Sequence, residues 1–137
     1  MSKYWSEITK GVEPYVCGEQ PKDKKYVKLN TNESPYPPSP KVIGAIKNAA
    51  NEELRLYPDP DCDKLRDVIS KYYGLNKNRI FIGNGSDEVL AMSFLTFFNK
   101  DETIIFPDIS YSFYPVYANL YNLNYKLAKL NEDFSIP

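Results

Sequence analysis

The chain of 137 residues contains no histidine. That absence excludes a Ser-His-Asp triad, a Cys-His nucleophile and any metal site with a histidine ligand within these residues. Cysteine is scarce as well: Cys17 and Cys62 lie far apart in the sequence, without the spacing of a metal site. We therefore interpret them as free thiols in a reducing compartment, with a disulfide as the open alternative.

Long apolar runs and an excess of one charge are also missing. No stretch of roughly 18 apolar residues is available to span a membrane, and residues 1–7 contain no apolar signal core. The 17 basic residues nearly balance the 18 acidic ones, so the composition gives no reason to expect binding to nucleic acid or to an anionic membrane. These absences favour a cytoplasmic protein without a nucleic-acid or membrane partner.

The first 38 residues favour an extended arm that packs onto another part of the protein. Apolar side chains such as Trp5, Tyr26 and Leu29 make this segment too apolar for a disordered tail. Glycines and prolines nevertheless interrupt every long periodic element, at Gly11, Pro14, Gly18, Pro21, Pro35, Pro37 and Pro38. We therefore divide the chain into an arm over residues 1–38 and a folded part over residues 39–137.

Two amphipathic helices are predicted directly after the arm. Ser39 can cap the first helix, because a proline at the first helical position follows it, and apolar side chains then share one face as far as residue 50. Asp61 or Asp63 can cap the second helix, which has an apolar face of its own. Gly74 is placed to end that second helix.

The pattern then changes to alternating strands and helices. Two short apolar runs and one alternating segment predict β-strands over residues 79–82, 103–106 and 123–128, and helices are predicted between them over residues 86–98 and 111–122. This order implies right-handed parallel crossovers, and therefore an α/β domain with helices on the faces of the sheet. Because three strands would leave both edges of the sheet unpaired, we expect the sheet to be incomplete.

A glycine loop at residues 83–85 lies between the first predicted strand and the helix that follows. The exposed N–H groups of a helix N-terminus bind phosphate, Gly85 allows the backbone to approach the ligand closely, and Ser86 adds a hydroxyl donor. A dinucleotide motif would have glycine where Glu88 stands, and the Gly-Lys-Ser/Thr of a P-loop is absent. The loop therefore indicates a phosphate monoester, or else an ordinary turn in which Ser86 caps the helix.

A second loop, residues 107–110, follows the next strand and is expected at the same carboxyl edge of the sheet. Ligands of open α/β sheets bind at this edge. Tyr111, directly after the loop, could stack on a flat ring whose phosphate lies in the glycine loop. The alternative is that Tyr111 and Tyr114 are core residues on the face of a helix.

Four segments, taken together and in this order, resemble the histidinol-phosphate aminotransferases. They are the Leu-Asn-Thr-Asn-Glu-Ser-Pro-Tyr stretch at 29–36, Leu-Tyr-Pro-Asp at 56–59 with Leu-Arg at 65–66, Gly-Asn-Gly-Ser-Asp-Glu at 83–88, and Tyr-Ser-Phe-Tyr at 111–114. The resemblance covers nearly all of this chain and only the front part of the family's length. The resemblance is therefore to the N-terminal portion of a pyridoxal-phosphate-dependent enzyme of fold-type I.

The resemblance implies a fold and an activity. Residues 39–137 would be the N-terminal part of the cofactor-binding large domain, whose three-layer parallel sheet is incomplete here, and residues 1–38 would form an arm and a substrate-side loop. The enzyme, usually a homodimer, would exchange an amino group between histidinol phosphate and 2-oxoglutarate in histidine biosynthesis. An aromatic aminotransferase, a threonine-phosphate decarboxylase and a truncated module that only binds the cofactor or self-associates are the alternatives.

The resemblance also implies the binding residues. The backbone of Gly85, Ser86 and Asp87 would hold the phosphate of pyridoxal 5'-phosphate, and Tyr111 would stack on its pyridine ring. Tyr57 would reach the phosphate bound in the partner subunit. On the substrate side, the resemblance adds Tyr15 in the arm and Asn32.

No catalytic residue is assigned. Transamination uses a lysine that forms a Schiff base with the cofactor and moves a proton, and a carboxylate opposite the pyridine nitrogen. In the family, the lysine and the carboxylate lie beyond the region that resembles this chain, as does an arginine that binds the substrate carboxylate. No lysine of this chain stands in a matching motif. We therefore expect these residues alone to be inactive in transamination.

This expectation can be tested by reduction with borohydride in the presence of pyridoxal phosphate. We expect no single lysine of residues 1–137 to be labelled stoichiometrically, because the lysine that bonds the cofactor is predicted to lie elsewhere. Peptide mass spectrometry would locate any label. Full labelling of one lysine would show that the chain carries its own nucleophile.

Overall fold

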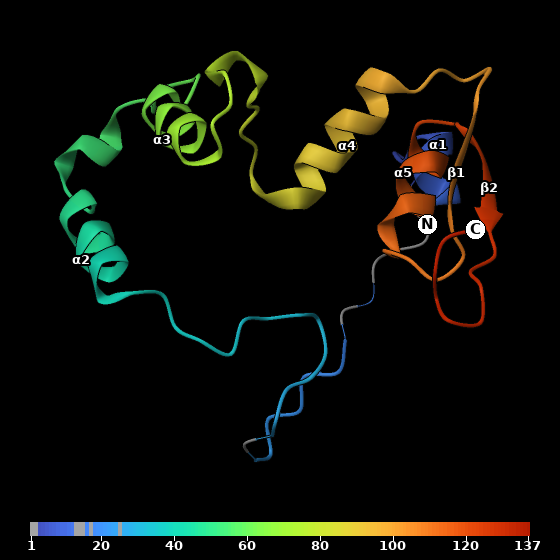
Figure 1. Ribbon diagram of the computed structural model, residues 1–137, viewed down its shortest axis with the longest axis horizontal. Helices are drawn as coiled ribbons and strands as arrows, with labels where there is room; N and C mark the ends of the chain where they lie inside the picture. Colours follow the sequence, from blue (N-terminus) through green and yellow to red (C-terminus); the bar gives the residue numbers. More distant parts are fainter. Residues whose placement is uncertain (1–2, 13–15, 17, 25) are drawn as a thin grey trace. The chain divides into compact units, whose positions relative to one another are not determined.

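The computed structural model describes residues 3–12, 16, 18–24 and 26–137. The chain divides into two compact units, one formed by Met1–Pro14 with Lys64–Pro137 and the other by Tyr15–Asp63. Figure 1 shows the course of the chain and labels its helices and strands.

The first unit contains a small parallel sheet. Strand β1 (Thr103–Pro107) pairs in parallel with β2 (Asn124–Ala128), and helix α5 (Phe113–Leu120) connects them. The strands predicted over residues 103–106 and 123–128, and a helix between them, are therefore confirmed. Parallel strands require such a crossover because the chain must return to the starting edge before it can pair again. The resulting mixture of helix and parallel strand agrees with the predicted α/β class.

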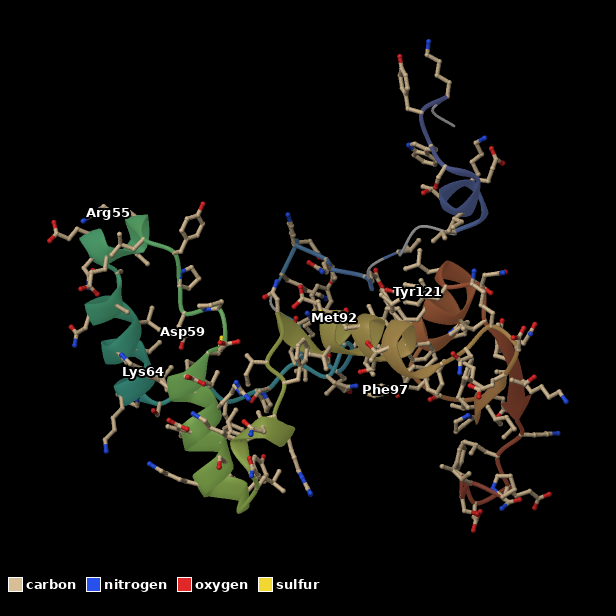
Figure 2. All side chains as sticks on the ribbon, turned by 90° about the horizontal axis from the view of Figure 1, so that it is seen from above. Arg55, Asp59, Lys64, Met92, Phe97 and Tyr121 are labelled. Carbon is tan, nitrogen blue, oxygen red and sulfur yellow. The ribbon has the colours of Figure 1, made fainter. Side chains whose placement is uncertain are left out.

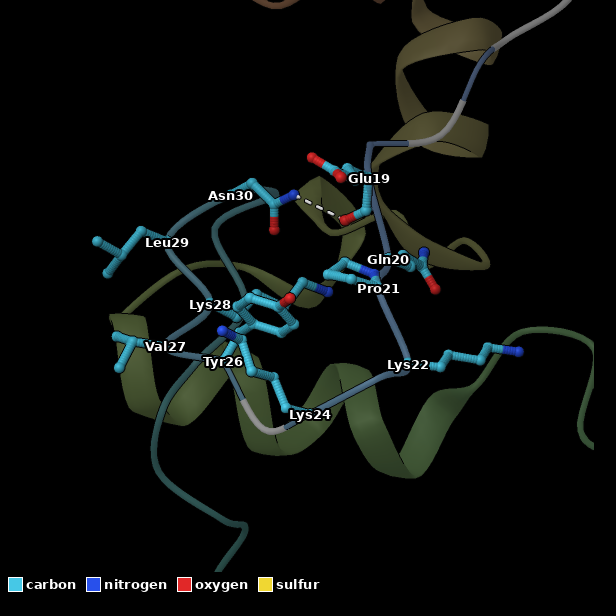
Figure 3. Close-up of a pocket in the computed structure, with 10 residues that line it drawn as sticks. All are labelled: Glu19, Gln20, Pro21, Lys22, Lys24, Tyr26, Val27, Lys28, Leu29 and Asn30. Atoms are coloured by element: carbon cyan, nitrogen blue, oxygen red, sulfur yellow. Dashed lines mark hydrogen bonds between the residues drawn. The ribbon is translucent and has the colours of Figure 1, made fainter.

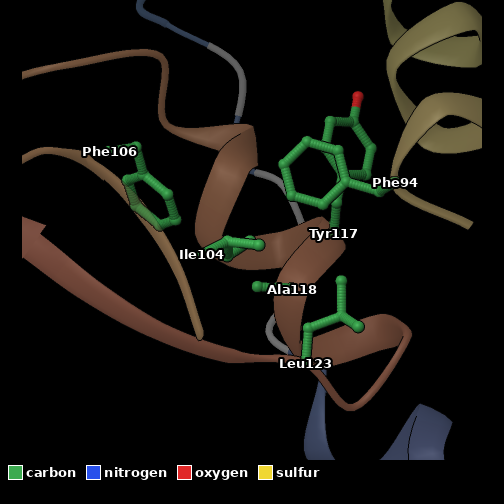
Figure 4. Close-up of a cluster of buried hydrophobic side chains, with 6 residues drawn as sticks. All are labelled: Phe94, Ile104, Phe106, Tyr117, Ala118 and Leu123. Carbon is green, nitrogen blue, oxygen red and sulfur yellow. The ribbon is translucent and has the colours of Figure 1, made fainter. Parts of the chain in front are cut away.

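The core of this unit lies between the sheet, α5 and helix α4 (Gly85–Phe97). Ile104 and Phe106 alternate with exposed residues along β1, so one face of the strand is buried and the other is open. Figure 4 shows the complete cluster, in which an aromatic side chain of α4 lies beside an aromatic of α5. Its six members are Phe94, Ile104, Phe106, Tyr117, Ala118 and Leu123.

The strand predicted over residues 79–82 is wrong. Arg79, the first residue of that predicted strand, is the last residue of a 3₁₀ turn, η2 (Lys77–Arg79). The turn is capped from within the same segment, because the Asn76 side chain accepts from the Asn78 N–H at 2.9 Å. Residues 80–83 are irregular, and Phe81 is 62% exposed. A strand exists only where its backbone is paired, and in the described part of the chain β1 and β2 pair with each other alone.

Helix α3 (Asp63–Tyr73) ends as its sequence predicts. Gly74 adopts φ 65°, a left-handed conformation that glycine tolerates without strain, and the N–H of Leu75 then donates to the carbonyl of Ser70 at 3.0 Å. At the other end of the helix, the carboxylate of Asp59 accepts from the N–H of Asp63 at 2.7 Å and from the N–H of Asp61 at 3.1 Å. Asp59 is thus a capping group that the sequence pattern did not single out.

The second unit contains helix α2 (Pro40–Ala49) and a 3₁₀ turn, η1 (Glu52–Arg55). The predicted cap of α2 is confirmed, because Ser39 Oγ accepts from the N–H of Val42 at 3.4 Å. The apolar face of α2 is largely exposed to solvent, and Ile46 on this face is 61% exposed. Figure 2 shows that side chains project from the ribbon along much of the chain.

The described part of the arm is irregular, apart from one short element. Helix α1 (Glu7–Gly11) belongs to the first unit and is capped by Ser6, whose Oγ accepts from the N–H of Thr9 at 3.2 Å. The sequence analysis did not anticipate this turn of helix. Among the described residues, no helix is both long enough and apolar enough to cross a membrane.

The packing around Ala118 gives a prediction about stability. Ala118 is 0% exposed, so Ala118→Leu should force its neighbours apart and lower the free energy of unfolding by about 1–3 kcal/mol. Chemical denaturation would measure the change. Ala45→Leu, at an exposed position of α2, is the matched control and should change the stability by less than about 0.5 kcal/mol. Equal effects of the two substitutions would contradict a closely packed core at Ala118.

Candidate functional site

The start of α4 and the residues after β1 meet around one carboxylate. The hydroxyl of Tyr111 donates a short hydrogen bond to Oδ1 of Asp87, 24 residues earlier in the chain. The hydroxyl of Tyr117 donates to the same oxygen at 3.2 Å and to the backbone carbonyl of Asp87 at 3.1 Å. Asp87 is in the first turn of α4, so two tyrosines tie this helix terminus to α5 and to the loop before it.

The glycine loop is shaped by close contacts that exclude larger residues. A Cβ atom at Gly83 would lie 2.6 Å from Cγ2 of Val89, which is closer than van der Waals contact permits. Gly85 adopts φ 84°, and its N–H donates to the carbonyl of Gly83 at 3.0 Å. The carboxylate of Glu88 reaches back to accept from the N–H of Asn84. The loop is therefore held tightly against the first turn of α4.

The helix begins one residue earlier than the sequence predicts. Asn84 is the N-cap residue and Gly85 the first residue of α4. The alternative in which Ser86 caps the helix is therefore wrong, since Ser86 lies inside the first turn. Helical geometry leaves the N–H groups of Ser86 and Asp87 without an acceptor within the helix, and both residues are exposed. Such amides, with the positive end of the helix dipole, can bind an anion.

The loop before α5 is fixed by Asp108. Its N–H continues the sheet by donating to the carbonyl of Ala128 at 3.0 Å, and its Oδ1 accepts from the N–H groups of Ile109 and Leu130 at 3.0 Å each. The bonds to Ala128 and Leu130 join the end of β1 to the end of β2 and the segment after it, and the bond to Ile109 lies within the loop. Tyr111 therefore stands on a loop whose base is anchored to the sheet.

The two candidate aromatics, Tyr111 and Tyr114, have different surroundings. Tyr114 is partly buried and packs against Phe94 and Phe106, with ring centroids 6.1 and 5.7 Å away. Tyr111 is 42% exposed and packs against Phe113 and Tyr114. The core interpretation thus describes Tyr114, whereas Tyr111 keeps exposed ring surface on which a flat ligand could stack.

Tyr117 is the residue of this region that the sequence analysis missed. Its side chain is 5% exposed, and its ring lies against Phe94 and Phe113 at centroid distances of 5.3 and 5.8 Å. Burial, followed by the charge and hydrogen bond of Asp87, raises the pKa of Tyr117 to about 12. The available sequence signal was its position four residues after Phe113, on the same face of a helix.

The remaining predicted site residues belong to the other unit or are not described. Tyr57 is fully exposed, at 102%. Asn32 is exposed and lies in a turn in which Thr31 and Asn32 adopt φ 60° and 54°. Tyr15 lies outside the described residues. Of the predicted site residues, the structure thus brings Asp87 and Tyr111 into direct contact within one unit, whereas Asn32 and Tyr57 lie in the other unit.

A hollow lies elsewhere, in the segment from Glu19 to Asn30 (Figure 3). Lys22, Lys24 and Lys28 line it beside the ring of Tyr26, and the Asn30 side chain donates to the carbonyl of Glu19 at 3.3 Å. Every lining residue is exposed, so this hollow offers no polar group removed from water to bind a ligand. The geometry favours the first turn of α4 and Tyr111 as the candidate site.

Comparison with known proteins identifies the class. Residues 24–136 match the family described as aminotransferase class I and II. This match includes both segments that meet at Asp87 and most of the chain. The chain therefore belongs to the aminotransferase class I and II family.

Individual relatives are more specific. The chain is 76% identical to a histidinol-phosphate aminotransferase of Clostridium botulinum (strain Okra / Type B1), over 99% of this chain and 38% of the relative's length. It is 63% identical to the histidinol-phosphate aminotransferase of Clostridium beijerinckii, over 100% of this chain and 38% of that protein. The corresponding protein of Clostridium acetobutylicum is also 63% identical, with 99% of this chain and 39% of the relative covered. The chain thus spans less than half the length of these relatives.

The raised pKa of Tyr117 predicts a particular alkaline response. Between pH 10 and about 12 the folded state keeps a proton that this tyrosine loses in the unfolded state. The resulting stabilisation is complete below pH 10 and is lost as the pH rises toward about 12. Tyr117→Phe should therefore flatten the alkaline fall in unfolding free energy, measured by denaturation at several pH values. Parallel curves for the wild type and Tyr117→Phe would contradict this coupling.

Proposed function

We propose that this chain forms the phosphate-binding and ring-stacking part of a pyridoxal-phosphate-dependent aminotransferase that acts on histidinol phosphate, with 2-oxoglutarate as the other substrate. The observation that carries the proposal is the hydrogen bond between Tyr111 and Asp87, which joins a partly exposed aromatic residue to the first turn of α4. The family match and the names of the relatives support the reaction class and the substrate.

The chemistry of the first turn fits the phosphate of the cofactor. The N–H groups of Ser86 and Asp87 and the dipole of α4 supply donors and positive potential for a dianion, and the hydroxyl of Ser86 can add another donor. Gly85 carries no Cβ and has no atom nearby that would hinder the approach of a ligand. The nearness of Val89 leaves no room for a side chain at position 83 of this loop.

Tyr111 orients the flat part of the cofactor in this proposal. Its hydroxyl is held by Asp87, which restricts the ring to one setting, while its exposed surface remains open to stacking. When bound, pyridoxal phosphate supplies an electron sink for the carbon that loses and gains a proton. Stacking by Tyr111 would exclude water from one face of that ring system.

The parts of the site outside this unit complete the proposal. Tyr57, fully exposed in the described structure, would reach the phosphate bound by a second copy of the chain in a homodimer. Asn32 and Tyr15 would border the substrate. The sheet would belong to the larger parallel sheet of a fold-type I large domain. The lysine, carboxylate and arginine of the reaction would come from the part of the relatives that this chain does not span.

Cofactor binding by the full chain tests the proposal. Pyridoxal phosphate would be titrated against the wild type, Tyr111→Ala and Ser86→Ala, with absorbance or fluorescence as the signal. Loss of a stacking ring costs about 1–3 kcal/mol, so Tyr111→Ala should raise Kd by roughly 5- to 150-fold, and Ser86→Ala should raise it several-fold. Tyr72→Ala removes an 80% exposed tyrosine from α3 and should leave Kd unchanged.

Two results would count against the proposal. A wild-type chain that does not bind pyridoxal phosphate would remove the cofactor assignment. Binding that is equally strong in wild type, Tyr111→Ala and Ser86→Ala would place the ligand elsewhere and leave these residues with roles in packing and folding alone.

A further inference from the structure

We infer that Tyr117 is a positioning residue for the cofactor site: it fixes the first turn of α4 against α5, and through Asp87 it fixes the ring of Tyr111. The inference rests on the proposed function, because it concerns how the proposed cradle is held. It goes beyond that function in naming a buried side chain that touches neither the phosphate nor the ring in the proposal.

The first argument is the sharing of one carboxylate. Oδ1 of Asp87 accepts hydrogen bonds from both Tyr111 and Tyr117, and the carbonyl of Asp87 accepts a further one from Tyr117. The backbone and the side chain of one residue are therefore both attached to α5. Tyr117 shares its single hydroxyl proton between these two acceptors, so a movement of the first turn of α4 would break this bifurcated hydrogen bond and would carry the partner of Tyr111 with it.

The second argument is the contrast in burial between the two tyrosines. Tyr117 is 5% exposed and is one of the six core side chains in Figure 4, in contact with Phe94 and Phe113. Tyr111 is 42% exposed, so packing alone fixes it less firmly. Close-packed neighbours hold Tyr117 in one rotamer, and the shared carboxylate passes that constraint on to Tyr111.

The third argument is electrostatic. A carboxylate in the first turn of α4 would repel a phosphate dianion bound at the same helix terminus. Two hydroxyl donors at Oδ1 direct the carboxylate of Asp87 toward the tyrosines and partly compensate its charge. With its pKa raised to about 12, Tyr117 keeps its donor proton well into the alkaline range. The N–H groups of the first turn of α4 can then bind the ligand while the carboxylate of Asp87 is bonded to the tyrosines.

The test compares Tyr117→Phe with Tyr121→Phe in the full chain. Both substitutions remove one hydroxyl and keep the ring, and Tyr121 follows α5 directly and packs against the same core. Three quantities would be measured: amide hydrogen exchange in residues 84–88, the Kd for pyridoxal phosphate, and the circular dichroism of the bound cofactor, which reports the orientation of its ring. Tyr111→Phe, at an exposed position where folding is not at risk, removes the other donor to Asp87.

For Tyr117→Phe we expect several-fold faster exchange in residues 84–88, a Kd raised about 3- to 10-fold and a smaller cofactor dichroism. A net hydrogen bond contributes roughly 0.5–1.5 kcal/mol, which corresponds to this range of Kd. Tyr111→Phe should reduce the dichroism in the same direction, and Tyr121→Phe should resemble the wild type in all three measurements.

The outcomes separate this inference from the proposed function. If the wild type binds pyridoxal phosphate and Tyr117→Phe changes neither the Kd nor the dichroism, the inference is overturned and the proposed function stands. Exchange in residues 84–88 that is the same for Tyr117→Phe and Tyr121→Phe would also overturn it. A wild-type chain that binds no pyridoxal phosphate would overturn both.

Discussion

The arrangement of the first unit depends on Asp87 as a shared hydrogen-bond acceptor. The carboxylate of Asp87 accepts hydrogen bonds from the hydroxyls of Tyr111 and Tyr117, and its backbone carbonyl also accepts from Tyr117. These bonds connect the start of α4 with the loop after β1 and with α5. Without this connection, the glycine loop and the aromatic loop would be two separate surface features. With it, the first turn of α4 and the partly exposed ring of Tyr111 belong to one hydrogen-bonded group, which is the arrangement that the proposed site for a phosphorylated aromatic ring uses.

Local sequence signals predicted most elements of this fold. Ser39 and Gly74 are examples, because caps and stops depend on the nearest few residues. The strand expected at residues 79–82 failed because its apolar side chains say nothing about whether a neighbouring strand is available for pairing. The candidate site shows the same difference between features that depend on neighbouring residues and features that depend on distant ones. Glycine spacing predicted the tight turn before α4, whereas the contact of Tyr117 with Asp87, 30 residues away, is a tertiary interaction that no local pattern encodes.

The family assignment and the geometry support each other at different levels. The similarity to aminotransferases indicates which class of reaction to consider. By itself it does not indicate how the residues of this chain are arranged in space. The structure supplies that arrangement for Asp87, Tyr111 and Tyr117. It also distinguishes Tyr111 from Tyr114, two tyrosines of one motif, by placing the first partly in solvent and the second against the core.

Helix α4 has its first turn at the candidate site and Phe94 in the core, seven residues after Asp87. At 1.5 Å per residue, these points are only about 10 Å apart along one rigid rod. Substitutions that repack the core around Phe94 are therefore expected to shift the first turn of α4 as well. For the cofactor site proposed above, this couples the packing of the core to the affinity for the ligand through a single helix.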